Sequence, residues 1–250
     1  MRTKTLLLSA VALLAAGFVS TQAQPVYSQN VVGYASVKTT SGNTYALTVP
    51  FKIGVSNGAN EVWPLDGLGN PTIPDFSTLL IWTGTGYQTY VSDSGSPTLW
   101  DMYDQSTPTN APEIPVSQAF FLTPGGDTTN VFAGVVAVIV GSSNVVHLAS
   151  GNTYFVAPAV PYGGTVTNGS PTTGVGGPNL WSPDGVQGLP DFSTVLIWTG
   201  TGYQTYVSDS GSATYWDMYD QSTPTNAPVL NVGQGFFLTP GGDFSWKVGL

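Results

Sequence analysis

Residues 74–112 read PDFSTLLIWTGTGYQTYVSDSGSPTLWDMYDQSTPTNAP, and residues 190–228 read PDFSTVLIWTGTGYQTYVSDSGSATYWDMYDQSTPTNAP. Only three positions differ between the two stretches, and they are Leu79/Val195, Pro97/Ala213 and Leu99/Tyr215. A near-identical block of this length, present twice in one chain, predicts two copies of one folding unit.

The repeat extends beyond this block. QAFFLTPGGD at 118–127 matches QGFFLTPGGD at 234–243, at the same offset of 116 residues (74 to 190). SGNTY occurs at 41–45 and again at 150–154, at an offset of 109 residues (41 to 150), so the second copy holds a longer Gly- and Pro-rich loop before Pro190. A period above 100 residues is typical of whole domains rather than of solenoid repeats. We therefore predict two modules, residues 24–135 and 136–250.

Short apolar runs alternate with turn-forming residues inside each module. The run from Leu79 to Trp82 is apolar on both faces, which is typical of a central sandwich strand. Further strands are expected over Tyr87 to Val91, Thr98 to Tyr103 and Phe120 to Leu122, separated by turns rich in Gly, Ser, Asp and Pro. This spacing predicts an all-β fold of two tandem antiparallel β-sandwich-like modules, with no long helix after the N-terminal segment.

Three short motifs resemble a known kind of protein. They are NVVGY at 30–34, WTGTGY at 82–87, and QAFFL at 118–122, which in the second copy becomes QGFFL at 234–238, close to a G-x-G-F-F form. Together they resemble uncharacterised exported bacterial tandem β-modules with a late G-x-G-F-F motif. The resemblance implies a secreted, β-sandwich-like fold and carries no activity with it. Ala119 departs from the glycine that the motif leads us to expect.

The N-terminus has the pattern of an export signal. Arg2 and Lys4 precede an apolar run over residues 6–19, and Thr21-Gln22-Ala23 offers small residues for cleavage. This pattern predicts a secretory signal peptide over residues 1–23. The run is shorter than the roughly 20 apolar residues that a membrane-spanning helix needs. We therefore expect a secreted, extracellular or cell-surface protein with no membrane span.

The charge of the chain excludes several partners. Charged residues make up 8% of the chain, and the formal net charge is −9. Removal of Arg2 and Lys4 makes it −11 and leaves only Lys38, Lys52 and Lys247 as basic residues. So few cations cannot neutralise many phosphates, which argues against nucleic-acid binding. A weakly charged surface suits self-association or a polysaccharide matrix, and the absence of cysteine excludes disulfides and thiolate chemistry.

Repeated aromatic residues are the first candidates for ligand binding. Exposed rings can stack on the apolar faces of sugars, while neighbouring amides and carboxylates bind the hydroxyl groups. The candidates are Tyr90, Trp100, Tyr103, Tyr206, Trp216 and Tyr219. The alternative is that these rings pack in the core, since a sandwich without disulfides needs large apolar side chains. Tyr90 and Tyr103 are the two expected to be most exposed.

Repeated acidic residues are the second group of candidates. Asp101, Asp104, Asp217 and Asp220 could bind calcium or form a glycosidase pair, although no EF-hand pattern is present. The alternative is that they are solvated turn residues. Asp93-Ser94-Gly95, repeated at 209–211, resembles the catalytic turn of aspartic proteases, but it also suits an ordinary hairpin turn. No cofactor is expected beyond this possible calcium.

His147 is the only histidine, so a three-histidine zinc site is impossible, and no G-x-S-x-G motif accompanies it. We interpret it as a residue at a strand edge. The leading hypothesis is therefore a non-enzymatic structural or adhesive protein outside the cell. A bivalent carbohydrate-binding protein is the alternative, and a secreted hydrolase is the third. Self-association is also expected, because the Val131–Val140 and Val26–Val37 segments could each complete the sheet of a neighbouring chain.

Overall fold

The structure is a computed structural model. It describes residues 32–67, 69, 72–136, 143–158, 163–166, 189–212 and 215–249. The predicted signal peptide at 1–23 and most of the longer loop of the second copy lie outside the described residues. No helix in the described part is long and apolar enough to cross a membrane.

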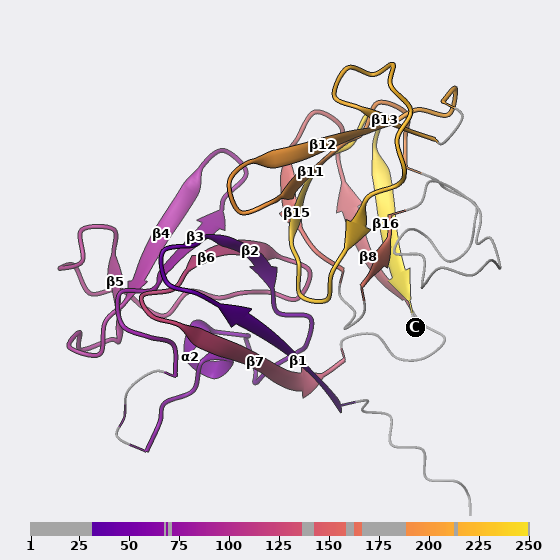
Figure 1. The fold of residues 1–250 in the computed structure, drawn as a ribbon. Helices are drawn as coiled ribbons and strands as arrows, with labels where there is room; N and C mark the ends of the chain where they lie inside the picture. Colours follow the sequence, from indigo (N-terminus) through magenta and orange to yellow (C-terminus); the bar gives the residue numbers. More distant parts are fainter. Residues whose placement is uncertain are drawn as a thin grey trace, which may run out of the picture.

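Module 1 is built from antiparallel strands in two layers (Figure 1). Its elements are β1 (Val32–Thr39), β2 (Tyr45–Thr48), the one-turn helix α2 (Ala59–Val62), β3 (Thr78–Trp82), β4 (Tyr87–Ser92), β5 (Trp100–Met102), β6 (Ala119–Thr123) and β7 (Thr128–Val135). One layer is a five-stranded sheet in the order β2-β6-β3-β4-β5. The other layer is the ribbon of β1 and β7, which cover one face of that sheet.

Module 2 repeats this plan. Its elements are β8 (Ser143–Leu148), β9 (Tyr154–Val156), β10 (Gly164–Thr165), β11 (Thr194–Trp198), β12 (Tyr203–Ser208), β13 (Trp216–Met218), β14 (Val229–Leu230), β15 (Phe236–Thr239) and β16 (Phe244–Gly249). The sheet order is β13-β12-β11-β15-β9, and each strand is the repeat counterpart of one in module 1. The ribbon of β8 and β16 covers this sheet, and β10 pairs with β14. The prediction of two all-β, sandwich-like modules is therefore confirmed.

Each module has its own hydrophobic core between sheet and ribbon. In module 1, Leu79 from the sheet and Phe132 from β7 are fully buried in one cluster, and Trp63 beside α2 fills the space between the layers. The Trp63 ring meets the rings of Phe120 and Phe132 edge-on, at centroid distances of 6.0 and 6.3 Å. Such edge-to-face pairs are a favourable packing of aromatic rings. In module 2, Phe236 and Trp246 form an edge-to-face pair at 5.7 Å, in which Trp246 stands at the repeat position of Asn130.

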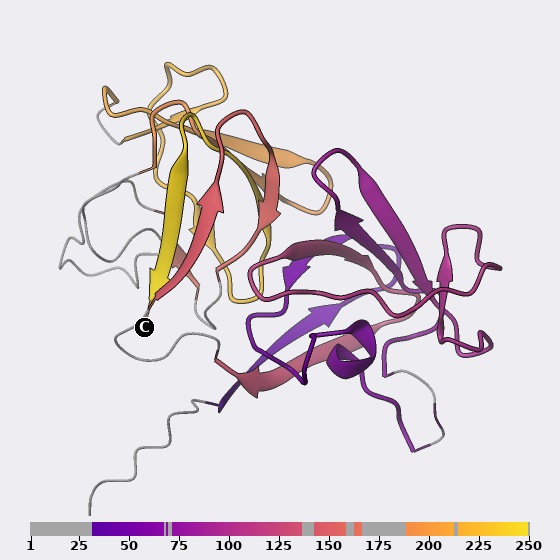
Figure 2. The same ribbon diagram turned by 180° about the vertical axis from the view of Figure 1, so that it is seen from behind.

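The two sheets also pack against each other through their second faces, which makes four layers in the order ribbon, sheet, sheet, ribbon. The cluster at this junction contains Phe121 from module 1 with Phe155 and Phe237 from module 2. Both faces of the central strands are thus covered, which is why the run from Leu79 to Trp82 is apolar throughout. Figure 2, which shows the same ribbon from behind, makes the contact between the two sheets visible.

The junction is reciprocal. Four of its hydrogen bonds form two counterpart pairs. Trp82 Nε1 donates to Thr153 O (2.9 Å) as Trp198 Nε1 donates to Thr44 O (2.7 Å), and Thr48 N donates to Gly233 O (2.9 Å) as Ala157 N donates to Ser117 O (3.0 Å). The isolated bridges between Leu47 and Gln234 and between Gln118 and Val156 form another pair. Contacts of this kind, in which each side uses the same patch, define an interface with two-fold symmetry. The two modules are therefore related by a pseudo-two-fold axis.

Two expectations about strands need correction. The return strand predicted over Thr98 to Tyr103 is shorter, because Leu99 adopts a left-handed backbone (φ 65°) that ends the extended run, and β5 begins at Trp100. The segments proposed to join a neighbouring chain pair with each other instead, as β1 and β7, from Val32 opposite Val135 onward. Their described parts are not spare strands, and self-association stays a prediction.

Candidate functional site

The six aromatic candidates divide into buried and exposed residues. Trp100 and Trp216 are buried, with 0% and 1% exposure, so the prediction that they bind ligands at the surface is wrong. Trp100 packs in the module core, and its Nε1 donates a hydrogen bond to Asn60 Oδ1 at 2.7 Å. Both tryptophans lie in the core because β5 and β13 turn these side chains toward the ribbon of their own module.

Tyr90 and Tyr206 are only partly exposed, because they pack against the same two cores. Burial raises the pKa of both phenols above its ordinary value. The expectation that Tyr90 is among the most exposed rings is therefore wrong. Tyr103 and Tyr219 are at the surface as expected, with 78% and 79% exposure.

A further pair of exposed rings was missed by the sequence analysis. Phe76 and Phe192 are 61% and 63% exposed, and both have left-handed backbones, with φ of 60° and 61°. A bulky residue in this region is strained by roughly 1–2 kcal/mol, so the surrounding contacts must hold it there. Phe76 N donates to Ser92 O at 2.7 Å, and Phe192 N donates to Ser208 O at the same distance. The strained φ was not visible in a sequence pattern that reads as an ordinary turn.

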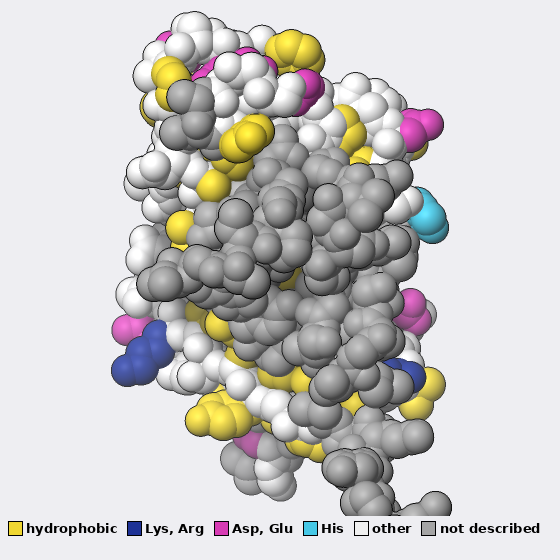
Figure 3. Space-filling view, turned by 90° about the vertical axis from the view of Figure 1, so that its right-hand side faces the viewer, with side chains coloured by type: hydrophobic (Ala, Val, Ile, Leu, Met, Phe, Trp, Pro, Cys, Tyr) yellow, Lys and Arg dark blue, Asp and Glu magenta, His cyan; other side chains and the backbone are white. Residues whose placement is uncertain are grey.

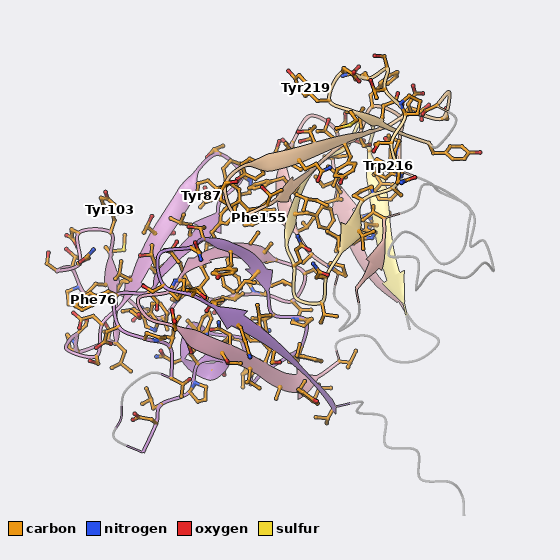
Figure 4. All side chains as sticks on the ribbon, in the orientation of Figure 1. Phe76, Tyr87, Tyr103, Phe155, Trp216 and Tyr219 are labelled. Carbon is orange, nitrogen blue, oxygen red and sulfur yellow. The ribbon has the colours of Figure 1, made fainter. Side chains whose placement is uncertain are left out.

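We call Phe76, Tyr103, Phe192 and Tyr219 the outer aromatic residues. Figure 4 shows Phe76 and Tyr103 at the end of module 1 that points away from the junction, and Tyr219 at the outer end of module 2. Tyr87 and Phe155 lie between the modules in the same view. The chain therefore displays the same exposed rings twice, once on each side of the pseudo-two-fold axis.

The acidic candidates do not form a metal site in the described part of the chain. Asp101 and Asp217 are buried, with 3% exposure each, and the Oδ1 atom of each has no hydrogen-bond partner among the described residues. Asp104 is exposed and accepts hydrogen bonds from Ser106 N (3.2 Å) and Thr107 N (2.9 Å). Asp220 caps the same turn in module 2.

The side-chain hydrogen bond from Thr107 and the backbone bonds of this turn lower the pKa of Asp104. This is the environment of a turn acid, and no group of three or more acidic or histidine side chains among the described residues could hold a metal ion. The structure gives the predicted calcium sites at these four positions no support.

The described residues also do not form the arrangement that an aspartic protease or a histidine-based active site would need. Asp93 Oδ1 accepts a hydrogen bond from Gly95 N at 2.8 Å, which is a local turn contact, and Asp209 does the same in module 2. Both residues follow strands that begin at the junction and run outward for six residues, or roughly 20 Å. Two carboxylates on opposite sides of the axis at this distance cannot share a proton. His147 is exposed on β8, and its Nδ1 lies 2.8 Å from Ser245 Oγ.

Two grooves flank the junction, and each is formed by both modules. Groove A, of about 510 Å³, lies between Trp198, Thr199 and Thr201 of module 2 and Asn43 of module 1, with Val232 and Gln234 on its wall. Groove B, of about 750 Å³, is lined by the counterparts Trp82, Thr83, Thr85, Asn152, Val116 and Gln118. The WTGTG turn of each module therefore forms one wall of a groove whose other wall begins in the opposite module.

The grooves and the surrounding surface carry little charge. Among the described residues that line groove A none is ionisable at neutral pH, and the lining of groove B adds only His147. The described side chains in the face drawn in Figure 3 are mostly uncharged, with few acidic or basic groups among them. The described residues of the grooves can therefore form hydrogen bonds through amides and hydroxyls, next to apolar and aromatic surface.

Comparison with known proteins adds no function to these observations. No family model, no curated protein and no solved structure matches the chain. The resemblance to exported bacterial modules therefore stays a prediction from the motifs.

Proposed function

We propose that the chain is a non-enzymatic protein with a structural or adhesive role outside the cell or on its surface. The observation that carries the proposal is the paired display of the outer aromatic residues on two modules packed together through a core. Four exposed rings favour adsorption and association, because contact with a partner surface buries their apolar area.

The rigidity of the display supports the same conclusion. In module 1 the turn around Phe76 is fixed by Ser92 Oγ donating to Pro74 O (2.7 Å) and by Asp75 accepting from Ser94 N (2.9 Å). Module 2 has the same two contacts, at 2.7 and 2.8 Å. A backbone held in one conformation loses little conformational freedom when the ring it carries contacts a partner, which favours binding.

Retention of the purified chain on intact bacterial cells tests the proposal. A variant with serine at all four outer aromatic positions should lose most of its retention, because the contacting apolar area is gone. A variant with Gln88→Ser and Gln204→Ser, which also changes exposed residues, should be retained like the natural chain. Failure of the natural chain to bind any of the cells tested, or equal retention of the serine variant, would refute the proposal.

A second candidate function, bivalent carbohydrate binding, is favoured by one specific observation. The two junction grooves are nearly free of charge and combine an indole with amide and hydroxyl groups. These are the groups that recognise neutral sugars. A hydrolase requires a pair of carboxylates in a cleft, and none of the described residues that line the two grooves is acidic.

A further inference from the structure

We propose that grooves A and B are two equivalent binding sites for a neutral polysaccharide. This inference rests on the proposed extracellular binding role, and it assigns the ligand to the junction rather than to the outer aromatic residues.

The indole of each groove is held in a fixed orientation. Trp198 Nε1 donates to Thr44 O at 2.7 Å, and Trp82 Nε1 donates to Thr153 O at 2.9 Å. Both tryptophans are partly exposed, and both belong to the junction cluster. Because the polar atom of each indole is already bonded within the protein, the exposed part of the ring offers apolar surface to a ligand. Sugar rings present an apolar face that suits such a surface.

The other groups of the groove suit the hydroxyls of the same ligand. Asn43 and Asn152 are exposed counterparts on the opposite wall from the tryptophan, and Thr201 and Thr85 are exposed on the WTGTG turns. Amides and hydroxyls can each donate and accept, as sugar hydroxyls do. A charged ligand would find no opposite charge among the described residues that line groove A, whereas a neutral, hydroxyl-rich ligand leaves no charge unpaired.

The size and the number of grooves fit an extended ligand. Volumes of about 510 and 750 Å³ lie within the range of ordinary ligand sites. Because each groove needs both modules, neither site exists on one module alone. A polymer that reaches both grooves of one chain, or the grooves of neighbouring chains, would bind more tightly than a short oligosaccharide.

Isothermal titration calorimetry with cellohexaose, xylohexaose and hexa-N-acetylchitohexaose tests the proposal, with hexagalacturonate as the charged comparison. Thr201→Arg places a long cation in groove A, and Thr85→Arg does the same in groove B. Gln204→Arg makes the same charge change at an exposed position outside both grooves. The milder pair Asn43→Ala and Asn152→Ala serves if an arginine variant does not fold, as judged by circular dichroism.

We expect at least one neutral hexasaccharide to bind at two sites per chain. Each single arginine variant should remove one site, the double variant should weaken binding by about tenfold or more, and Gln204→Arg should leave both sites intact. The proposal is overturned if none of the three neutral probes binds, if hexagalacturonate binds more tightly than they do, or if the double variant weakens binding by clearly less than tenfold.

The proposed adhesive role and the proposed groove sites can be refuted independently of each other. Retention on cells that survives in the double arginine variant but is lost in the four-serine variant would support adhesion through the outer aromatic residues, and calorimetry alone would then decide whether the grooves bind polysaccharide. If both variants are still retained on cells, adhesion does not depend on the outer aromatic residues, whatever the calorimetry shows.

Discussion

The junction between the modules makes a quantitative prediction for Phe155→Ala. Phe155 is 3% exposed, and its ring stacks on that of Phe237 at 4.3 Å and 8° and lies 4.7 Å from that of Phe121. Loss of a buried phenylalanine side chain removes about 1.5–3 kcal/mol of burial energy. A residual void of about 50 Å³ would add about 1.2 kcal/mol at about 24 cal/mol per Å³. The expected loss in the free energy of unfolding is therefore about 3–4 kcal/mol, within the usual range for this substitution.

Urea denaturation followed by tryptophan fluorescence measures this loss. The natural chain should unfold in one cooperative transition, because the same core joins both modules. The matched control is Tyr219→Ala, which removes a ring that is 79% exposed and should change stability by no more than about 0.5 kcal/mol. A loss below about 1 kcal/mol for Phe155→Ala, or two separate transitions in the natural chain, would show that the modules do not share a packed core and would refute the four-layer arrangement.

Three further predictions concern the turns and the junction. Gly125→Ala should destabilise module 1 strongly, because the added Cβ would overlap the carbonyl oxygen of Asp75. The Cβ of Gly126→Ala would meet only side-chain atoms of Pro74, the nearest at 3.5 Å, and this variant should be tolerated. Thermal unfolding of the two variants checks this, and equal melting temperatures would contradict it. Partial burial and contact with Tyr203 raise the pKa of Tyr87. Its contribution to stability is therefore complete below the unfolded-state value of about 10 and is lost as the pH rises from there through the raised folded-state pKa. Melting temperatures from pH 8 to 11 should fall less steeply in Tyr87→Phe, and an unchanged slope would argue against the contact with Tyr203. Trp198→Phe removes the hydrogen bond to Thr44 O and should cost about 1 kcal/mol in urea denaturation, with Trp82→Phe costing a similar amount if the junction is symmetric.

The strands and the two-module organisation could be predicted from the sequence because they depend on local patterns. The apolar run of β3 and the Gly- and Ser-rich turns around β4 identify these elements without knowledge of the rest of the fold. The repeat then transfers the same interpretation to module 2. The limits of β5 were harder to predict, because nothing in the letters around Leu99 signals a left-handed backbone at a leucine.

The position of the candidate aromatic residues could not be predicted for a physical reason. Alternation along a strand separates a buried face from an exposed face only when one face meets solvent. In β5 both Trp100 and its neighbour Asp101 are buried, so alternation gives no guide to which ring is at the surface. The grooves could not be predicted from the sequence either, because the residues that meet in one of them, Trp198 and Thr44, are 154 residues apart in the chain.

The junction also explains what two copies in one chain allow that two identical chains would not. Phe155 has Ala46 as its repeat counterpart, and both residues belong to the junction cluster. In a symmetric dimer of identical modules, a phenylalanine at this position would place two rings near the axis, and an alanine would place none there. An extra ring in a packed core costs typically 1–3 kcal/mol by overpacking, and a missing ring leaves a cavity with a cost of its own. The tandem chain meets both constraints by keeping one ring, which stacks on Phe237 and packs against Phe121, while the surrounding backbone contacts remain reciprocal. The fusion of the modules therefore permits a better-filled junction than exact two-fold symmetry would, and the same junction forms both grooves.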